Sequence, residues 1–150
     1  MADHRELERS CTWLFDFSKL QQVQTKLDPV NPVVPVVVQD ANTKEVLIVA
    51  YVNKEALMYS LEHGIATFWS TSRNELWIKG KSSGDVLNLK EVRVNCEQNS
   101  LLYLVEPVKE GSCHVKDGSG KSMRTCYYRK LAFNSKEKNV NLEILPDFTL

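Results

Sequence analysis

The sequence lacks an excess of charge of either sign, because 19 lysines and arginines are balanced by 19 aspartates and glutamates. A chain-wide basic surface for nucleic acid is therefore not expected. Long apolar runs are also absent, and none approaches the ~18 residues of a transmembrane helix, so no membrane partner is expected. The first ten residues are charged and contain no apolar segment, which predicts a cytoplasmic protein without a secretory signal.

C-x-x-C pairs are absent, and the spacing of the cysteines argues against the common small zinc modules. The four cysteines are Cys11, Cys96, Cys113 and Cys126, and none belongs to a C-x-x-C pair. A zinc finger or zinc ribbon is therefore not predicted. In a reducing cytoplasm, we expect these side chains to be thiols or metal ligands rather than disulfides.

What is present is typical of one globular domain preceded by a helical segment. The 150 residues are 43% hydrophobic and 25% charged, close to the average of folded proteins, which argues against collagen, wholesale disorder and coiled coil. Residues 4–27 place apolar side chains at helical spacing and predict one or two helices. We interpret residues 1–17 as an N-terminal helical extension of the core domain.

The following pattern indicates a sheet. A β-branched run at 33–38 predicts a strand, which Pro35 should place at an edge or a bulge. The nearly all-apolar run at 46–52 predicts a strand covered on both faces. Asn53 is typical of a helix N-cap and Gly64 of a helix stop, so a short helix is expected between them, over 54–63.

The second half of the chain reads as short strands separated by polar turns. Strands are predicted at 66–70, 76–79, 86–96, 101–106 and 125–133. A polar loop containing glycine is expected at 116–122, before the last of these strands. Residues 134–150 are interpreted as a loosely held C-terminal tail. The predicted fold class is α+β: a small, mainly antiparallel sheet with one short inserted helix and a helical N-terminus.

Three of the cysteines suggest metal chemistry. Sixteen residues separate Cys96 from Cys113, and twelve separate Cys113 from Cys126. Three thiolates from three different elements can hold zinc and leave a fourth position open, as in catalytic zinc sites. The alternative is that they are buried small hydrophobic residues. His114 is either a general base beside this metal or a surface imidazole on a loop.

The segment 68–84 suggests an anionic ligand. It contains two tryptophans, four serines, one arginine and two lysines. Cationic groups, hydroxyls and backbone N–H groups next to glycine suit phosphate oxygens, and an indole can stack on a base. The alternative is a hairpin whose tryptophans pack in the core and whose charges are solvated. An excess of basic residues over 109–138 favours an anion only weakly, because a solvated loop has the same composition.

Several motifs together resemble the phosphoribosyl-AMP cyclohydrolase family of histidine biosynthesis over roughly residues 18–130. The resemblance is strongest in the block from Trp69 to Gly84, which reads W-S-x-S-R-x-x-L-W-x-K-G-x-S-S-G. It continues through Cys96, the step Gly111-Ser112-Cys113-His114, and Cys126-Tyr127-Tyr128-Arg129. On this basis we interpret residues 18–133 as a cyclohydrolase-like domain.

The resemblance implies a homodimer with zinc sites between subunits, each held by Cys96 of one chain and by Cys113 and Cys126 of the other. It implies that water adds at C6 of the adenine ring of phosphoribosyl-AMP and that the N1–C6 bond breaks, with His114 moving protons. Zinc suits this hydrolysis because it makes water nucleophilic near neutral pH. The residues implied to bind the phosphorylated purine nucleotide are Trp69, Ser70, Ser72, Arg73, Lys79, Ser82, Ser83 and Gly84.

The sequence departs from the family around the first zinc cysteine. The family carries three acids there that bind magnesium, whereas this chain has Asn95, Glu97 and Asn99. Magnesium favours carboxylates and water, so two amides should weaken such a site greatly. The loop 114–125 is also about six residues longer than is usual in the family. An alternative is therefore a diverged member that binds a purine nucleotide and zinc but has lost or changed its catalytic activity.

Overall fold

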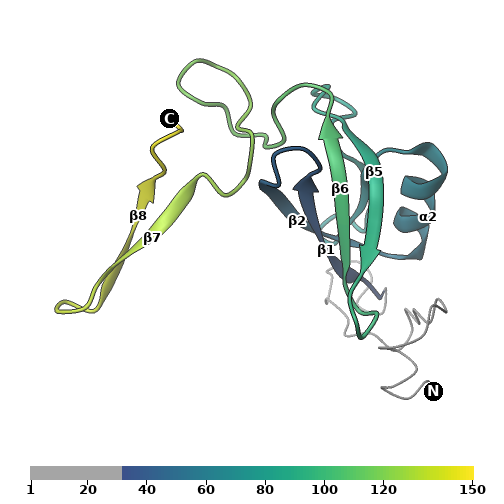
Figure 1. The fold of residues 1–150 in the computed structure, drawn as a ribbon, viewed down its shortest axis with the longest axis horizontal. Coiled ribbons are helices and arrows are strands. Elements are labelled where there is room, and N and C mark those ends of the chain that lie inside the picture. Colours follow the sequence, from purple (N-terminus) through teal and green to yellow (C-terminus); the bar gives the residue numbers. More distant parts are fainter. Residues whose placement is uncertain (1–31) are drawn as a thin grey trace.

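A computed structural model describes residues 32–150 (Figure 1). The predicted helices over 4–27, the extension 1–17 and Cys11 lie outside the described residues. The elements, in chain order, are β1 (Val34–Asp40), β2 (Val46–Val52), α2 (Lys54–His63), β3 (Thr67–Ser70), β4 (Glu75–Ile78), β5 (Leu87–Val94), β6 (Leu101–Pro107), β7 (Arg129–Asn134) and β8 (Asn139–Ile144). In the described part, one helix accompanies eight strands, so the predicted α+β class is confirmed.

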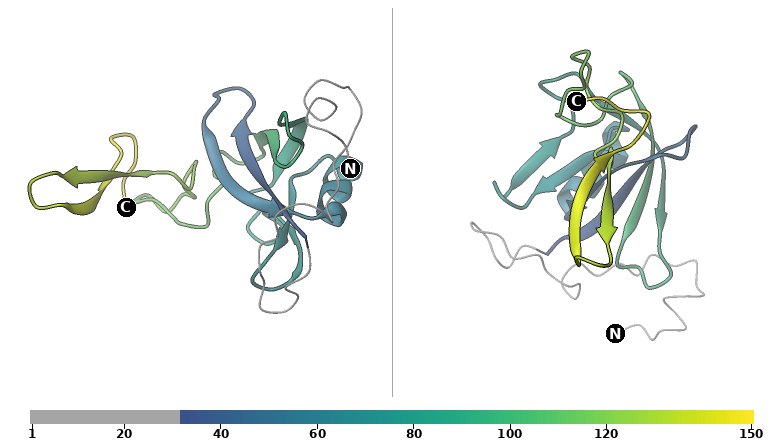
Figure 2. Two further views of the ribbon diagram at one scale, coloured as in Figure 1. Left: turned by 90° about the horizontal axis from the view of Figure 1, so that it is seen from below. Right: turned by 90° about the vertical axis from the view of Figure 1, so that its left-hand side faces the viewer.

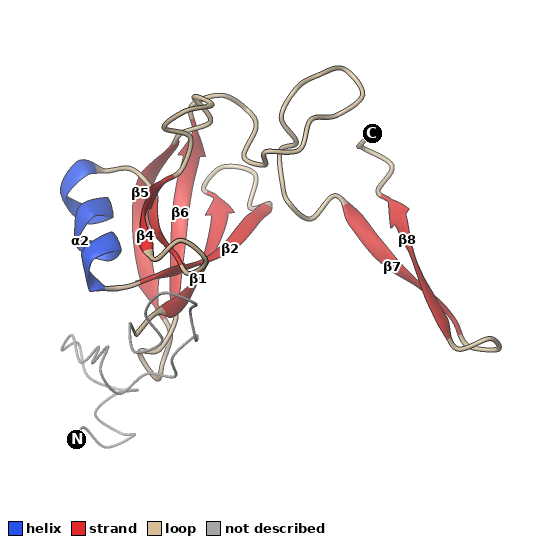
Figure 3. Ribbon diagram, turned by 180° about the vertical axis from the view of Figure 1, so that it is seen from behind, coloured by secondary structure: helices blue, strands red, loops and turns tan. Residues whose placement is uncertain are grey.

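The core is a four-stranded sheet in the order β2-β1-β6-β5. The pairs β1–β2 and β5–β6 are antiparallel, whereas β1 and β6 run parallel. Helix α2 and the β3–β4 hairpin lie on the same side of this sheet (Figure 3). The core cluster is buried between them, with Val36 of β1, Leu57 of α2, Phe68 of β3 and Tyr103 of β6 among its members. Alternating strand residues therefore supply one continuous apolar layer.

Two strand predictions need correction. Pro35 does not mark an edge strand, because β1 lies between β2 and β6. The proline is tolerated because the β6 ladder begins only at Val36, and the register shift between β1 and β2 lies further on, at Val38 and Gln39. Strand β2 is not covered on both faces, since it is an edge strand and Val49 on its outer face is 47% exposed.

The predicted helix is confirmed with its caps. The Asn53 side chain accepts a hydrogen bond from the backbone N–H of Ala56 at 2.9 Å. Gly64 adopts a left-handed conformation, with φ +67°, and its N–H donates to the Ser60 carbonyl. This residue type fits because a left-handed residue at a helix C-terminus is least strained as glycine. Within residues 32–150, no helix is long and apolar enough to cross a membrane.

The C-terminal region differs from the prediction of a strand at 125–133 and a loose tail. Strand β7 begins only at Arg129 and pairs with β8, which lies within the expected tail. The strand starts later because Thr125 and Cys126 bond to β2 carbonyls instead of to a hairpin partner. The β7–β8 hairpin projects away from the four-stranded sheet (Figures 1 and 2).

Candidate active site

A glycine-dependent turn shapes the candidate site after β4. Gly80 has φ +82°, and its carbonyl accepts the Gly84 N–H at 2.7 Å. A Cβ atom on Gly80 would lie only 2.2 Å from the carbonyl carbon of Asp85. Glycine is therefore required both by the backbone angle and by the close approach of the two chain segments. The turn places Lys79 and Asp85 next to each other.

Cys113 and Cys126 are brought together by the segment that follows β6. The Cys113 N–H donates to the Met123 carbonyl at 3.0 Å, and the Cys126 N–H donates to the Leu47 carbonyl of β2 at 2.8 Å. Cys113 is buried, and its thiol neighbours that of Cys126 at the surface. Partial burial and the neighbouring Cys113 thiol raise the pKa of Cys126 to about 12, and the nearby Lys79 ammonium opposes that increase.

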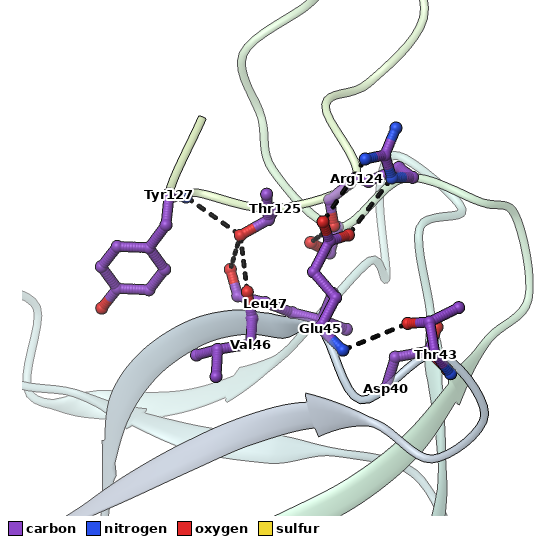
Figure 4. Close-up of polar contacts among 9 residues, drawn as sticks. Asp40, Thr43, Glu45, Val46, Leu47, Arg124, Thr125 and Tyr127 are labelled. Atoms are coloured by element: carbon purple, nitrogen blue, oxygen red, sulfur yellow. Dashed lines mark hydrogen bonds and ion pairs between the residues drawn. The ribbon is translucent and has the colours of Figure 1, made fainter. Parts of the chain in front are cut away.

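The residues around Cys126 are held on β2 by polar contacts (Figure 4). The Thr125 hydroxyl donates to the Val46 carbonyl at 2.7 Å and accepts the Tyr127 N–H at 3.0 Å. The Arg124 guanidinium forms an ion pair with Glu45 at 3.2 Å. These contacts fix the position of one cysteine of the pair relative to the main sheet.

Lys79 occupies an unusual place for a lysine. Lys79 is only 7% exposed, and its ammonium lies near Asp85, Cys126 and Cys113. Burial lowers the pKa of Lys79 from its usual value, and the charges of Asp85 and the two cysteines oppose that decrease. Asp85 is also buried and accepts a hydrogen bond from the Ser122 hydroxyl at 2.8 Å. A buried cation and a buried carboxylate therefore stand beside the thiol pair.

A pocket of about 530 Å³ opens next to Lys79. The predicted site residues that line it are Arg73, Lys79, Ser82, Ser83 and His114. The pocket therefore joins the β4 turn to the loop after Cys113, two regions far apart in the sequence. Its lining has two further cations, Lys81 and Lys116, and two acids, Glu75 and Asp85. Such a basic surface suits the oxygens of a phosphorylated ligand.

Asp85, Ser122 and Lys116 were missed by the sequence reasoning. Lys116 donates to the Ser122 hydroxyl at 2.8 Å, which in turn donates to Asp85. These hydrogen bonds connect the loop 114–125 to the floor of the pocket. The signal that was available is the position of Asp85 directly after the Ser-Ser-Gly turn, but its burial depends on the fold.

Four of the predicted ligand-binding residues do not line this pocket: Trp69, Ser70, Ser72 and Gly84. Trp69 packs against the core, and its indole N–H donates to the Asn74 side chain at 3.1 Å. The Ser70 hydroxyl accepts the Arg73 N–H at 3.3 Å and shapes the tip of the β3–β4 hairpin. For Trp69, the contacts agree with the alternative of a core tryptophan, and the ligand-binding roles of all four residues stay predictions.

The three positions related to magnesium form a closed turn between β5 and β6. The Asn95 side-chain oxygen accepts the N–H groups of Asn99 and Ser100, each at 2.9 Å. The Asn95 amide donates to the Asn99 oxygen at 2.6 Å, and the Asn99 amide reaches Glu97 at 3.4 Å. The amide oxygens are thus engaged within the turn, and Glu97 supplies the sole carboxylate of the three.

Cys96 lies in this same turn, before β6 begins, whereas Cys113 lies in the segment after β6 ends; Figure 1 shows the two ends of this strand. Sixteen residues lie between the two cysteines, and the seven that form β6 correspond to roughly 20 Å of strand. Accordingly, residues 32–150 contain no group of three or more histidine, cysteine or acidic side chains placed to hold a metal ion. Two of the three predicted zinc ligands meet within one chain, and the third does not.

Comparison with known proteins supports the motif analysis. A family model described as phosphoribosyl-AMP cyclohydrolase matches residues 48–128. The phosphoribosyl-AMP cyclohydrolase of Methanosarcina barkeri (strain Fusaro) is 50% identical over 95 residues, which cover 63% of this chain and 68% of that protein. The protein of the same name from Archaeoglobus fulgidus is 46% identical over 98 residues, covering 65% of this chain and 84% of that protein.

A longer relative extends beyond the match. The histidine biosynthesis bifunctional protein HisIE of Aquifex aeolicus is 39% identical over 113 residues, which cover 75% of this chain. The match spans 52% of that protein, or about half its length. The matched family region contains the Gly80 turn, the pocket and all three site cysteines. This chain therefore belongs to the phosphoribosyl-AMP cyclohydrolase family.

Proposed function

We propose that this protein opens the adenine ring of phosphoribosyl-AMP hydrolytically, a step of histidine biosynthesis, and that it uses zinc. Water adds to C6 and the N1–C6 bond breaks. The water oxygen becomes the carbonyl oxygen of a carboxamide, and its two hydrogens end on the exocyclic nitrogen and on N1. The observation that carries the proposal is the meeting of Cys113, Cys126 and Lys79 beside a basic pocket that also contains His114.

The thiol pair fits a zinc ion in its chemistry. Two neighbouring sulfurs suit a soft, four-coordinate metal, and the Lys79 ammonium beside them favours the thiolate of Cys126. Two ligands are too few, so we propose that Cys96 of a second copy of the chain supplies the third. Bound zinc would supply the Lewis acidity that makes water nucleophilic near neutral pH.

The pocket residues have separate roles in this proposal. Arg73, Lys81 and Lys116 hold the phosphate groups, with hydroxyls of Ser82 and Ser83 as further donors. The Lys79 ammonium, held between Asp85 and the thiols, favours negative charge at the reacting centre. His114 transfers a proton to the leaving nitrogen N1.

The Asn95–Ser100 turn does not fit magnesium. Its amide oxygens already accept hydrogen bonds within the turn, and one carboxylate alone holds the ion weakly. We therefore derive no step through magnesium. The same observation supports the second candidate function, a family member that binds zinc and a purine nucleotide without turnover.

Turnover of phosphoribosyl-AMP, followed by the ultraviolet change of ring opening, distinguishes the two functions. We expect activity without added magnesium and loss of activity on zinc chelation. His114→Ala should keep zinc but lower turnover about 100-fold or more. Binding of the nucleotide by the zinc-loaded protein with no product would favour the non-catalytic function. In that case, a magnesium-dependent gain of activity in the double variant Asn95→Asp, Asn99→Asp would show that only the acidic cluster is missing.

Mixing two inactive variants tests the shared zinc site. Cys96→Ser and Cys113→Ser each remove one ligand, so each protein alone should lose zinc and activity. If the ligands come from two chains, a mixture forms some dimers in which one site has all three native cysteines. Activity should then return to about a quarter of the wild-type value for random pairing. A mixture as inactive as its components would refute the shared site, and Cys11→Ser serves as the control that keeps zinc.

A further inference from the structure

The β7–β8 hairpin has one apolar face and one polar face. Leu131 pairs with Leu142, and Phe133 pairs with Val140, so these four side chains lie on the same face together with Ile144. We call this set the hairpin apolar face. On the opposite face, Lys130 forms an ion pair with Glu143 at 3.7 Å, and Ala132 pairs with Asn141. Apart from Arg129, which pairs with Ile144 at the base of the hairpin, this alternation is typical of a strand pair that is covered on one side.

Nothing in residues 32–150 covers this apolar face. Leu131 is 70% exposed and Phe133 is 67% exposed, while the other members are 38–56% exposed. The hairpin stands clear of the main sheet in Figure 1 and in the left-hand view of Figure 2. An isolated two-stranded hairpin is marginally stable in water, and it needs packing against another surface. The hairpin therefore requires a partner for its apolar face.

We propose that the hairpin apolar face packs on a second copy of this chain, so that each hairpin is an arm that holds the other subunit. The hairpin follows Cys126 by only two residues. Under the proposed function, on which this step rests, Cys126 lies where a second copy contributes Cys96. An element that leaves the core at this point is directed towards the neighbouring subunit.

The area involved agrees with a reciprocal exchange of arms. Five exposed large apolar side chains offer on the order of 500 Å², the size of the largest apolar patch on a typical monomer. If each arm covers a patch on the other copy, the total area buried is on the order of 2,000 Å², which a stable dimer requires. Two arms packed only on each other would bury about half of that. The core also offers apolar surface for such an arm, since Val46 and Val49 of β2 are 40% and 47% exposed.

A pair of matched double variants tests the arm. Leu131→Thr with Phe133→Thr makes the apolar face polar but keeps residues that favour strands. Lys130→Thr with Asn141→Thr changes the polar face of the same hairpin and serves as the control. Sedimentation over a range of concentrations should give a dimer for the wild type and the control. The apolar-face variant should dissociate with a constant at least about 100-fold higher. Far-ultraviolet circular dichroism and tryptophan fluorescence show whether its core stays folded.

Hydrogen exchange supplies a measurement that does not depend on a variant. Amides of β7 and β8 should be protected at concentrations where the wild type is dimeric and should exchange quickly on dilution. A monomeric wild type, a dimer that survives in the apolar-face variant, or protection that is independent of concentration would each overturn the arm. The last result would mean that the hairpin is covered within its own chain. The arm and the proposed function can fail separately. If the wild type is a dimer, the apolar-face variant dissociates and the wild type does not turn over phosphoribosyl-AMP, the proposed function is refuted but the role of the arm is supported.

Discussion

The strongest test of the site geometry is a comparison of alanine at two glycines. Gly64 and Gly80 both have positive φ, at +67° and +82°, so alanine at either position is strained by about 1–2 kcal/mol. Around Gly64, a new Cβ would meet no atom within 4 Å. At Gly80 it would lie 2.2 Å from the backbone of Asp85, and the two segments must separate, which adds about 1–3 kcal/mol.

Gly64→Ala should therefore lower the free energy of unfolding by about 1–2 kcal/mol, and Gly80→Ala by about 2–5 kcal/mol. Urea unfolding followed by tryptophan fluorescence measures both values. Because Lys79 and Asp85 flank the displaced turn, Gly80→Ala should also reduce turnover under conditions where it is still folded, while Gly64→Ala should not. Equal losses of stability in the two variants, or full activity in folded Gly80→Ala, would refute the assigned role of the turn.

Further predictions concern the helix cap, the buried lysine and the thiol pair. Asn53→Ala removes the side chain that accepts the Ala56 N–H and should lower the free energy of unfolding by about 1–2 kcal/mol in the same urea assay, whereas no change would contradict the cap. Lys79→Met keeps an apolar stem but loses the cation, so the KM for phosphoribosyl-AMP or its turnover should worsen at least about tenfold, with zinc content unchanged. Because the pKa of Cys126 is raised to about 12, its thiol is protonated at neutral pH and must release that proton to bind metal. Zinc affinity, measured by competition with a chelator between pH 6 and 8, should therefore rise about tenfold per pH unit for each proton released, and a flat profile would contradict the raised pKa.

Local pattern was sufficient to predict most of the core elements. The helix between Asn53 and Gly64 has the predicted bounds because both caps act within a few residues of chain. The parallel pairing of β1 with β6 could not be predicted, since no short-range pattern encodes which distant strand lies next to another. The β7–β8 hairpin was missed although Val140, Leu142 and Ile144 alternate with polar residues, because a short, polar-rich segment gives that signal little contrast.

The candidate site was also predictable only in part. The motif block indicated Arg73 and Lys79, and the Cys113-His114 step indicated His114; the fold brings all three to one pocket. The burial of Lys79 could not be predicted, because lysine is rarely buried and its position depends on the turn at Gly80 and on Asp85. For the cysteines, the spacing left open whether three separate elements supply metal ligands, and the fold brings Cys113 and Cys126 together within one chain.

The parallel pair at the centre of the sheet has a consequence for how the chain reaches this structure. All other strand pairs in residues 32–150 join neighbours in the sequence, so they can form as local hairpins within microseconds. The seam between β1 and β6, where Val36 pairs with Leu101, can form only after the two halves of the chain diffuse together. Loop-closure entropy opposes this step. We therefore expect refolding to be limited by closure of this seam, with preformed hairpins on either side of it.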